Sequence, residues 1–331
     1  MPLKHPLLFS MGLALSFTLS SCGEADTASP TPSEENKPAP AAETAKAETK
    51  PAMPKAPAPA AEPEPEKAKP VYWNEEMLHT EIKFHNPGYE GNAQFQMDGG
   101  QPQIISLRGA KVENLRFMER FKPLALDLSE TPISDIRPLQ GMKLVELYLE
   151  DTQVRDISAL RGMPLQKIYL SRTPVSDLSA LEGAPLVEFN AVGTEVKDLS
   201  PLAKSPIEML WLTDTPVENI APLKTVPLVS LTLHRTLVRD LSPLSGTGLQ
   251  RLHIGETPVT DLTPLKGMRL TRLVFNPDNI QKGMDVARAL PLQEIGTQFD
   301  DAGRDLAPPQ VFWAKWDAAH AAPAPTPPAK P

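Results

Sequence analysis

A 21-residue period runs without slippage from residue 102 to residue 269, and it constrains the fold more than any other feature. Each unit reads close to L-x-x-L-x-L-x-x-T-x-V-x-D-L-x-P-L-x-G-M-P, starting for example at Leu144. The L-x-L segment alternates with period two, which predicts a short strand whose leucines face one side. Because one unit cannot bury these leucines alone, neighbouring units must stack and pair their strands in parallel. The period therefore predicts a solenoid with a single long sheet.

The second half of each unit predicts a capped turn in place of a long helix. An aspartate precedes the Leu-x-Pro-Leu segment, and its carboxylate can accept a backbone N–H at the start of a short 3-10 or irregular turn. A calcium-binding column is the alternative, but asparagine replaces aspartate in two units, which favours capping. The capping positions are Asn114, Asp135, Asp156, Asp177, Asp198, Asn219, Asp240 and Asp261. The repeated threonines, from Thr131 to Thr257, are expected to bond the loop backbone inside the bend.

This pattern is the leucine-rich-repeat signature, and the shortness of the unit resembles the repeats of bacterial internalins. The resemblance implies an α/β solenoid: a leucine-rich-repeat horseshoe with a parallel concave β-sheet, a short 3-10 or irregular convex side, and helical caps at both ends. The stretch NPGYEGNAQFQ (86–96) resembles the N-terminal cap of some secreted bacterial proteins of this type.

The segments that flank the repeats predict the domain limits. Residues 71–101 are expected to form an N-terminal cap of a helix and a hairpin, and residues 102–291 the repeats. A helix is predicted over 278–290 at the end of the array. Residues 292–322 are expected to form a C-terminal cap of a strand and a helix, with Phe312, Trp316 and His320 on one face over the open end.

The N-terminal 70 residues predict export and a lipid anchor. Residues 1–21 contain a short apolar core typical of a signal peptide, followed by Leu-Ser-Ser-Cys, which resembles the lipobox of bacterial lipoproteins. The resemblance implies that Cys22, the sole cysteine, is acylated and that the lipid is the sole membrane contact. Residues 22–70, rich in Pro and Ala, are expected to be a disordered tether, and 323–331 a disordered tail. The expected location is the outer membrane or cell surface, with a periplasm-facing position left open.

The fifth position of the repeat is predicted to point outward onto the concave sheet, because its two neighbours point into the core. The column reads Ser106, Asp127, Tyr148, Tyr169, Asn190, Trp211, Thr232, His253 and Val274. Exposed Tyr and Trp are common anchors of binding sites. The alternative is stabilisation of the sheet by neighbouring rings. Trp211 lies two strands from Tyr169, and ring stacking was expected to explain its presence less well.

Charged residues in the adjacent columns predict a polarised face. Glu146 and Glu150, with Asp127, Glu130 and Asp151, make the first end acidic, whereas Arg235, Arg251 and Arg272 make the other end basic. His234 and His253 fall on adjacent strands nearby. Such a distribution could orient a partner of complementary charge, and solubility is the alternative explanation.

No arrangement of residues predicts catalysis, a metal site or a cofactor. The net charge of −8 argues against nucleic acid as a partner. The sequence therefore predicts a non-enzymatic cell-envelope lipoprotein that binds a protein partner through its concave face. Binding of a glycan such as peptidoglycan, or a purely structural role as an envelope spacer, are the alternatives.

Overall fold

A computed structural model describes residues 72–298 and 305–320 of the chain. The chain divides into two units, Met1–Glu66 and Lys67–Pro331, and all described elements belong to the second. The predicted signal peptide, Cys22, the tether and the tail at 323–331 lie outside the described residues, so these interpretations stay predictions. Among the described helices, none is long and apolar enough to cross a membrane.

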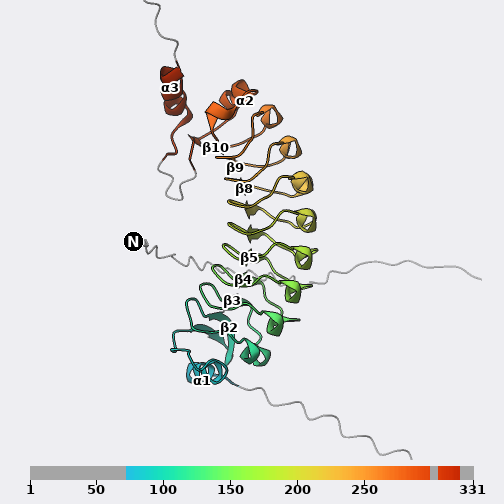
Figure 1. Cartoon of the computed structure of the whole chain (residues 1–331), viewed down its shortest axis with the longest axis vertical. Helices are drawn as coiled ribbons and strands as arrows, with labels where there is room; N and C mark the ends of the chain where they lie inside the picture. Colours follow the sequence, from blue (N-terminus) through green and yellow to red (C-terminus); the bar gives the residue numbers. More distant parts are fainter. Residues whose placement is uncertain (1–71, 299–304, 321–331) are drawn as a thin grey trace, which may run out of the picture. The chain divides into compact units, whose positions relative to one another are not determined.

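One sheet of 11 strands runs through the second unit, and the strands follow one another in chain order (Figure 1). Strands β1 (Gln94–Asp98) and β2 (Gln101–Ser106) form an antiparallel hairpin, and all later neighbours pair in parallel. The later strands are β3 (Ala125–Asp127), β4 (Glu146–Tyr148), β5 (Lys167–Tyr169), β6 (Glu188–Asn190), β7 (Met209–Trp211), β8 (Ser230–Thr232), β9 (Arg251–His253), β10 (Arg272–Val274) and β11 (Glu294–Gly296). Equivalent repeat positions pair directly, so each column of the repeat continues along the sheet.

Short 3-10 turns lie on the side of the stack away from the strands (Figure 1). They are η1 (Arg116–Arg120), η2 (Arg137–Leu139), η3 (Ser158–Leu160), η4 (Ser179–Leu181), η5 (Ser200–Leu202), η6 (Ala221–Thr225), η7 (Ser242–Leu244) and η8 (Thr263–Leu265). Together with the parallel sheet, they confirm the predicted leucine-rich-repeat solenoid with a 3-10 outer side.

The capping role predicted for the Asp and Asn column is confirmed. Each of these side chains accepts the backbone N–H of the residue two positions later, at 2.8–2.9 Å. Asp156, for example, accepts from Ser158 at 2.8 Å. The carboxylates are therefore used to begin the turns.

The interior is a continuous stack of aliphatic side chains that every repeat extends. Leu147, Leu149 and Val154 are fully buried, as are their equivalents in the other repeats. Seven threonine hydroxyls donate to the carbonyl three residues earlier, at 2.5–2.8 Å: those of Thr131, Thr152, Thr173, Thr194, Thr215, Thr236 and Thr257. The predicted threonine ladder thus satisfies polar groups inside the bend.

The N-terminal end is covered by helix α1 (Glu75–His85) and the β1–β2 hairpin. Asn74 begins the helix by accepting the N–H of Met77 at 2.8 Å, and Leu78 and Ile82 are buried. The buried side chain of Asn86 accepts the N–H groups of Glu113 and Asn114 at 2.9 Å and donates to the Asn114 carbonyl. Asn86 therefore fixes the end of α1 to the first repeat.

At the C-terminal end the predicted helix over 278–290 is wrong in its extent. A 3-10 turn, η9 (Pro277–Asn279), comes first, and the helix α2 covers only Met284–Ala289. Asn276 accepts the N–H of Asp278 at 3.1 Å and starts the turn. Gly283 has a φ of 82°, a left-handed conformation that interrupts a continuous helix.

Helix α3 (Pro309–His320) packs against β11 and covers the last repeat. Phe312 and Trp316 are partly buried against the core, but Trp313 is the most buried aromatic of the helix, at 9% exposure. The Arg288 guanidinium lies 4.3 Å from its ring and also pairs with Asp317. The predicted face of Phe312, Trp316 and His320 therefore omitted the main anchor.

Candidate binding face

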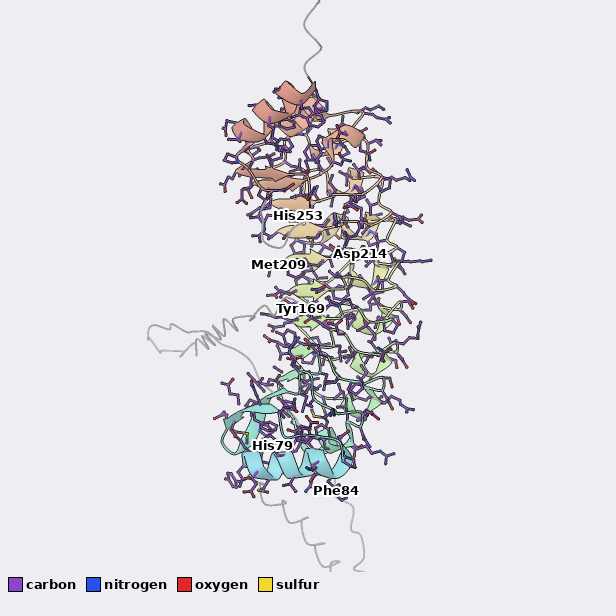
Figure 2. The ribbon with its side chains drawn as sticks, turned by 60° about the vertical axis from the view of Figure 1, so that its left-hand side comes forward. His79, Phe84, Tyr169, Met209, Asp214 and His253 are labelled. Atoms are coloured by element: carbon purple, nitrogen blue, oxygen red, sulfur yellow. The ribbon has the colours of Figure 1, made fainter. Side chains whose placement is uncertain are left out.

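The strands of the repeats alternate between buried and accessible side chains, as the sequence predicted. In β4, Leu147 is fully buried, whereas Glu146 and Tyr148 on either side are partly accessible. Strands β5, β6 and β7 show the same pattern. Figure 2 shows Tyr169, Met209 and His253 one above another along this face. The fifth-position column thus lies on the sheet surface opposite to the core.

Tyr148, Tyr169 and Trp211 form one continuous group of rings, here called the aromatic strip. The rings of Tyr148 and Tyr169 are stacked with centroids 5.0 Å apart. The Trp211 ring lies 6.2 Å from Tyr169 at an interplanar angle of 35°. Ring contact was expected to explain Trp211 less well, but the structure shows this contact even though β6 lies between the two strands.

The phenol hydroxyls of the strip are held by carboxylates on the same face. Tyr148 Oη donates to Glu146 Oε2 at 2.9 Å, and Tyr169 Oη donates to Glu188 Oε2 at 2.7 Å. Lys167 Nζ lies 3.2 Å from Glu188 Oε1 and 3.8 Å from Glu146 Oε1. One lysine therefore bridges the two glutamates that orient the tyrosines, and the rings are fixed before any ligand arrives.

The electrostatic surroundings of the tyrosines are negative. Burial raises the pKa of Tyr148, and Glu146 is the next largest cause. Burial likewise raises the pKa of Tyr169, followed by its hydrogen bond to Glu188. Both hydroxyls therefore stay protonated at physiological pH and act as donors to the carboxylates.

Asn190 has a local structural role between the rings. Its Oδ1 accepts from Ser171 Oγ at 2.8 Å and from the Val192 N–H at 3.0 Å. Asp127 is used in the same way, accepting the Ser129 N–H at 2.9 Å. The oxygen of Asn190 is thus occupied by hydrogen bonds within its own sheet.

The acidic end of the face contains an arginine that the sequence analysis did not consider. Arg108 forms ion pairs with Asp127 at 3.2 Å, Glu130 at 2.8 Å and Glu150 at 3.3 Å. Arg108 stands two repeats before Glu150, in the same column, so extending that column to the first strand would have found it. The acidic end is therefore partly neutralised.

The prediction that the second end of the face carries a net positive charge is wrong. Arg235 pairs with Asp214 through two bonds of 2.5 and 2.6 Å, and Arg272 pairs with Glu294 at 2.7 Å. Across residues 72–298 and 305–320, no ion pair to Arg251 is found. The sequence did not show that the two other arginines have acidic partners one strand away.

The two histidines also differ from their predicted role. His234 is buried, at 2% exposure, so it is not part of an accessible surface. His253 is partly accessible, and burial followed by Arg272 and Arg251 lowers its pKa to about 4. Burial and then Arg235 also lower the pKa of His234. Both side chains are therefore neutral at physiological pH, and they belong to the packing of the second half of the sheet.

Comparison with solved structures places this architecture among known folds. Internalin C2 from Listeria monocytogenes matches with a TM-score of 0.53 and 20% identity, over 60% of this chain and 92% of that one. The chain has a leucine-rich-repeat fold. The internalin InlF of the same organism matches with 25% identity and a TM-score of 0.49, over 59% of this chain and 67% of that one. No family model matches the chain, and no curated protein does.

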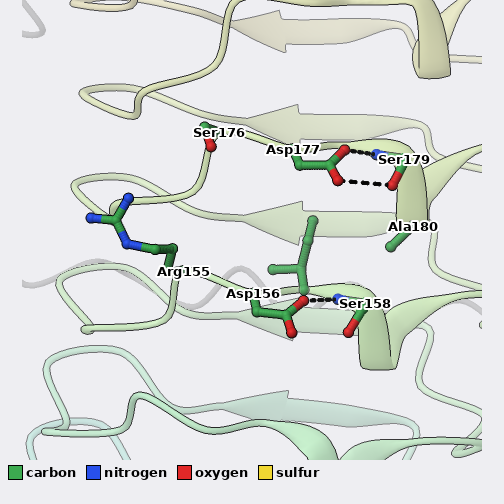
Figure 3. Close-up of a pocket in the computed structure, with 8 residues that line it drawn as sticks. Arg155, Asp156, Ser158, Ser176, Asp177, Ser179 and Ala180 are labelled. Atoms are coloured by element: carbon green, nitrogen blue, oxygen red, sulfur yellow. Dashed lines mark hydrogen bonds between the residues drawn. The ribbon is translucent and has the colours of Figure 1, made fainter.

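A pocket of about 210 Å³ lies on the other side of the solenoid, between the turns η3 and η4 (Figure 3). Its polar side chains are already engaged: Asp156 and Asp177 cap the two turns, and Arg155 pairs with Glu195 at 3.2 Å. Ala180 stands where most repeats carry proline. The pocket is therefore a gap between turns, and its carboxylates are committed to the backbone.

A column of left-handed residues borders the sheet directly after the strands. Six residues other than glycine have φ between 52° and 59°, and all are charged: Glu130, Asp151, Arg172, Asp214, Arg235 and Glu256. Gly193 occupies the same position in another repeat, with φ of 67°. Arg172 pairs with Asp151, and Arg235 with Asp214, across neighbouring repeats. Several of these side chains were predicted to lie on the charged face, but their left-handed backbone conformation was not evident from the sequence.

Among the described residues no group of three or more His, Cys, Asp or Glu is arranged to hold a metal ion. Apart from Arg251 and the two histidines, which lie on the second half of the sheet, the predicted binding residues divide into two sets, and the structure adds two more residues. Tyr148, Tyr169 and Trp211 meet on one face with Glu146. Asn190, Glu150 and Arg235 are engaged by neighbouring protein groups. Lys167 and Glu188 are added by the structure, because pairing across strands was needed to see that they orient the tyrosines.

Proposed function

We propose that this chain is a non-enzymatic scaffold of the cell envelope that binds a protein partner through the aromatic strip. The observation that carries the proposal is that Tyr148, Tyr169 and Trp211, the only Tyr and Trp of residues 102–291, gather on the outward face of the sheet. Rigid aromatic rings give a large contact area at a small entropic cost. The surrounding hydrogen bonds fix the rings, which lowers the cost of binding further.

Glycan binding is the weaker alternative. Sugar recognition combines ring stacking with polar groups that bond to the hydroxyls of the sugar. Around the strip, the phenol hydroxyls donate to Glu146 and Glu188, and the Asn190 oxygen accepts from Ser171 and Val192. The hydroxyls of a glycan would have to share these acceptors, whereas an apolar protein side chain would need only the surfaces of the rings.

The envelope location is proposed from the N-terminal sequence alone. The apolar stretch ending in Leu-Ser-Ser-Cys supports cleavage before Cys22 and acylation of its sulfur, with residues 22–70 as a spacer. Mass spectrometry of the N-terminal peptide, from cells that express the full chain, is expected to find acyl chains on Cys22. A Cys22→Ser variant should lose the acyl mass and leave the membrane fraction. An unmodified Cys22 in membrane-bound protein would contradict this part of the proposal.

Partner binding is tested with the full chain carrying a C-terminal affinity tag and extracted from its own envelope in mild detergent. The variant Tyr148→Ala/Tyr169→Ala/Trp211→Ala is expected to lose a protein that the unaltered chain retains. The control variant Phe84→Ala/Leu237→Ala/Val311→Ala removes three exposed apolar side chains elsewhere and should retain it. Equal capture by all three would favour a structural spacer, and capture of cell-wall fragments instead of protein would favour a glycan ligand.

A further inference from the structure

The first half of the concave face carries more negative than positive charge, even after its internal ion pairs are formed. On this half, from β2 to β6 and the turns after these strands, the cations are Arg108, Lys167 and Arg172. The carboxylates are Asp127, Glu130, Glu146, Glu150, Asp151 and Glu188. Each cation is shared or matched, and a surplus of carboxylate remains around the aromatic strip.

The pKa values of Tyr148 and Tyr169 reflect this surplus of carboxylate. After burial, Glu146, Glu188 and Asp127 raise the pKa of Tyr148, and Glu188, then Tyr148 and Glu150, raise the pKa of Tyr169. A field that disfavours a phenolate favours a cation at the same place. Because the phenols donate their protons toward carboxylates, their ring faces are also made richer in electrons.

Aromatic faces attract cations through their quadrupole, most strongly where water is partly excluded. Tyr148 and Tyr169 are partly buried by their surroundings and remain partly accessible on the sheet surface. Carboxylates beside stacked rings would add an ionic attraction to this effect. The combination suits a lysine or arginine side chain better than a neutral or acidic one.

We propose that the partner presents an extended basic segment, and that its Lys or Arg side chains lie beside the stacked rings of Tyr148 and Tyr169, near Glu146 and Glu188. This inference rests on the proposed function and names the chemistry of the partner. Side chains on one face of an extended chain repeat every 6.8 Å or so, and the ring centroids of Tyr169 and Trp211 are 6.2 Å apart. A residue two positions from the cation therefore reaches Trp211 and Met209, where an apolar side chain fits.

The other half of the face limits where such a segment can bind. Arg251 on β9 has no ion pair among the described residues, whereas Arg272 on the next strand is paired with Glu294. A basic segment that continued from β7 to β9 would meet the Arg251 guanidinium. The carboxylates around β4–β6 therefore attract the segment, and the arginine on β9 repels it. Together these charges fix its position along the sheet.

The test uses the full chain in neutral detergent and two fluorescein-labelled hexapeptides, Lys-Ala-Lys-Ala-Leu-Ala and Glu-Ala-Glu-Ala-Leu-Ala, followed by fluorescence anisotropy at low salt. The lysine peptide is expected to bind about ten-fold or more tightly than the glutamate peptide. Glu146→Gln/Glu188→Gln keeps acceptors for the tyrosine hydroxyls and should weaken lysine-peptide binding about ten-fold. Tyr148→Leu/Tyr169→Leu should weaken it by a similar factor.

The matched control is Glu182→Gln/Glu218→Gln, which removes the same charge from two exposed glutamates away from the sheet. It should change lysine-peptide binding by less than about two-fold. Equal weakening by both glutamine pairs would overturn the proposal, because net charge alone would then explain binding. Equal affinity for the two peptides, or no binding of the lysine peptide below about 1 mM, would also overturn it.

The outcome is separable from that of the proposed function. A protein retained through the aromatic strip and displaced by the lysine peptide supports both. A protein that depends on the strip but is not displaced by the lysine peptide leaves the proposed function standing and overturns the basic segment.

Discussion

The outward faces of β4–β7 and of β8–β10 are built from the same repeat, yet they offer different surfaces. In the first region the fifth-position side chains Tyr148, Tyr169 and Trp211 remain partly accessible and contact one another. In the second region the equivalent Thr232 and Val274 are buried, and His253 is partly accessible. The repeat determines where a column lies, but the size of its side chains and their neighbours determine whether it is available to a ligand.

The two regions also differ in how their charges are arranged. Around β4–β6, Lys167 bridges two glutamates and a surplus of carboxylate remains. Around β8–β10, Arg235 and Arg272 have acidic partners and the histidines are held neutral. We therefore expect one scaffold to present a recognition surface on the first region and a packed, charge-balanced surface on the second.

The largest expected effect is common to the two regions, because it acts on the core that they share. Phe189 and Leu231 are fully buried under the first and second region, respectively. Phe189→Ala is expected to lower the free energy of unfolding by about 3–5 kcal/mol, and Leu231→Ala by about 2–5 kcal/mol, because each leaves a cavity in a close-packed stack. Denaturant unfolding of the full chain measures both. A cost below about 1 kcal/mol at either site would mean that the repeats there are loosely packed.

The next effect is specific to the second region. The pKa of His253 falls from 6.5 to about 4 on folding, through burial and then Arg272 and Arg251. Between these two pH values the unfolded chain binds a proton at this position that the folded chain does not. The free energy of unfolding should therefore decrease as the pH falls from 6.5 toward 4, by at most about 3 kcal/mol.

The pH dependence is measured by unfolding the full chain at a series of pH values. His253→Gln removes the group and should reduce the slope in this window, whereas the pKa of His234, also lowered by burial and then Arg235, leaves a smaller slope of the same sign. An unchanged slope in the variant would show that His253 is not the group responsible.

The sequence predicted the course of the chain better than the character of its surface, and the reason is physical. The strand, the capping Asp and the threonine ladder depend on contacts within a repeat or with its equivalents, so the period specifies them. The contact of Trp211 with Tyr169, the partners of Arg108 and Arg272 and the burial of His234 depend on side-chain reach between strands. At the C-terminal end the repeat stops, and the left-handed Gly283 then limits the helix predicted over 278–290.

A smaller effect separates stability from recognition in the first region. Tyr148→Ala/Tyr169→Ala/Trp211→Ala removes two ring contacts, each of which contributes about 0.2–1 kcal/mol across strands. The expected loss in the free energy of unfolding is therefore about 0.4–2 kcal/mol, well below that of Phe189→Ala. Thermal and denaturant unfolding measure it. A loss as large as that of Phe189→Ala would mean that the strip mainly stabilises the sheet, and the recognition role would lose its support.

The smallest effect concerns a feature that both regions share. Arg172 and Arg235 adopt left-handed φ values of 57° and 52°, and each pairs with an aspartate one repeat earlier. Alanine at either position loses an exposed ion pair, which contributes at most about 1 kcal/mol, and keeps the backbone strain. Glycine loses the same pair but removes the strain, which is about 1 kcal/mol for a residue with a side chain. Arg172→Gly and Arg235→Gly should therefore each be about 1 kcal/mol more stable than the alanine variant at the same position, as the natural Gly193 in this column suggests. Equal stability of the glycine and alanine variants would mean that the turn relaxes, and a difference at only one position would show that the two halves of the solenoid constrain their turns differently.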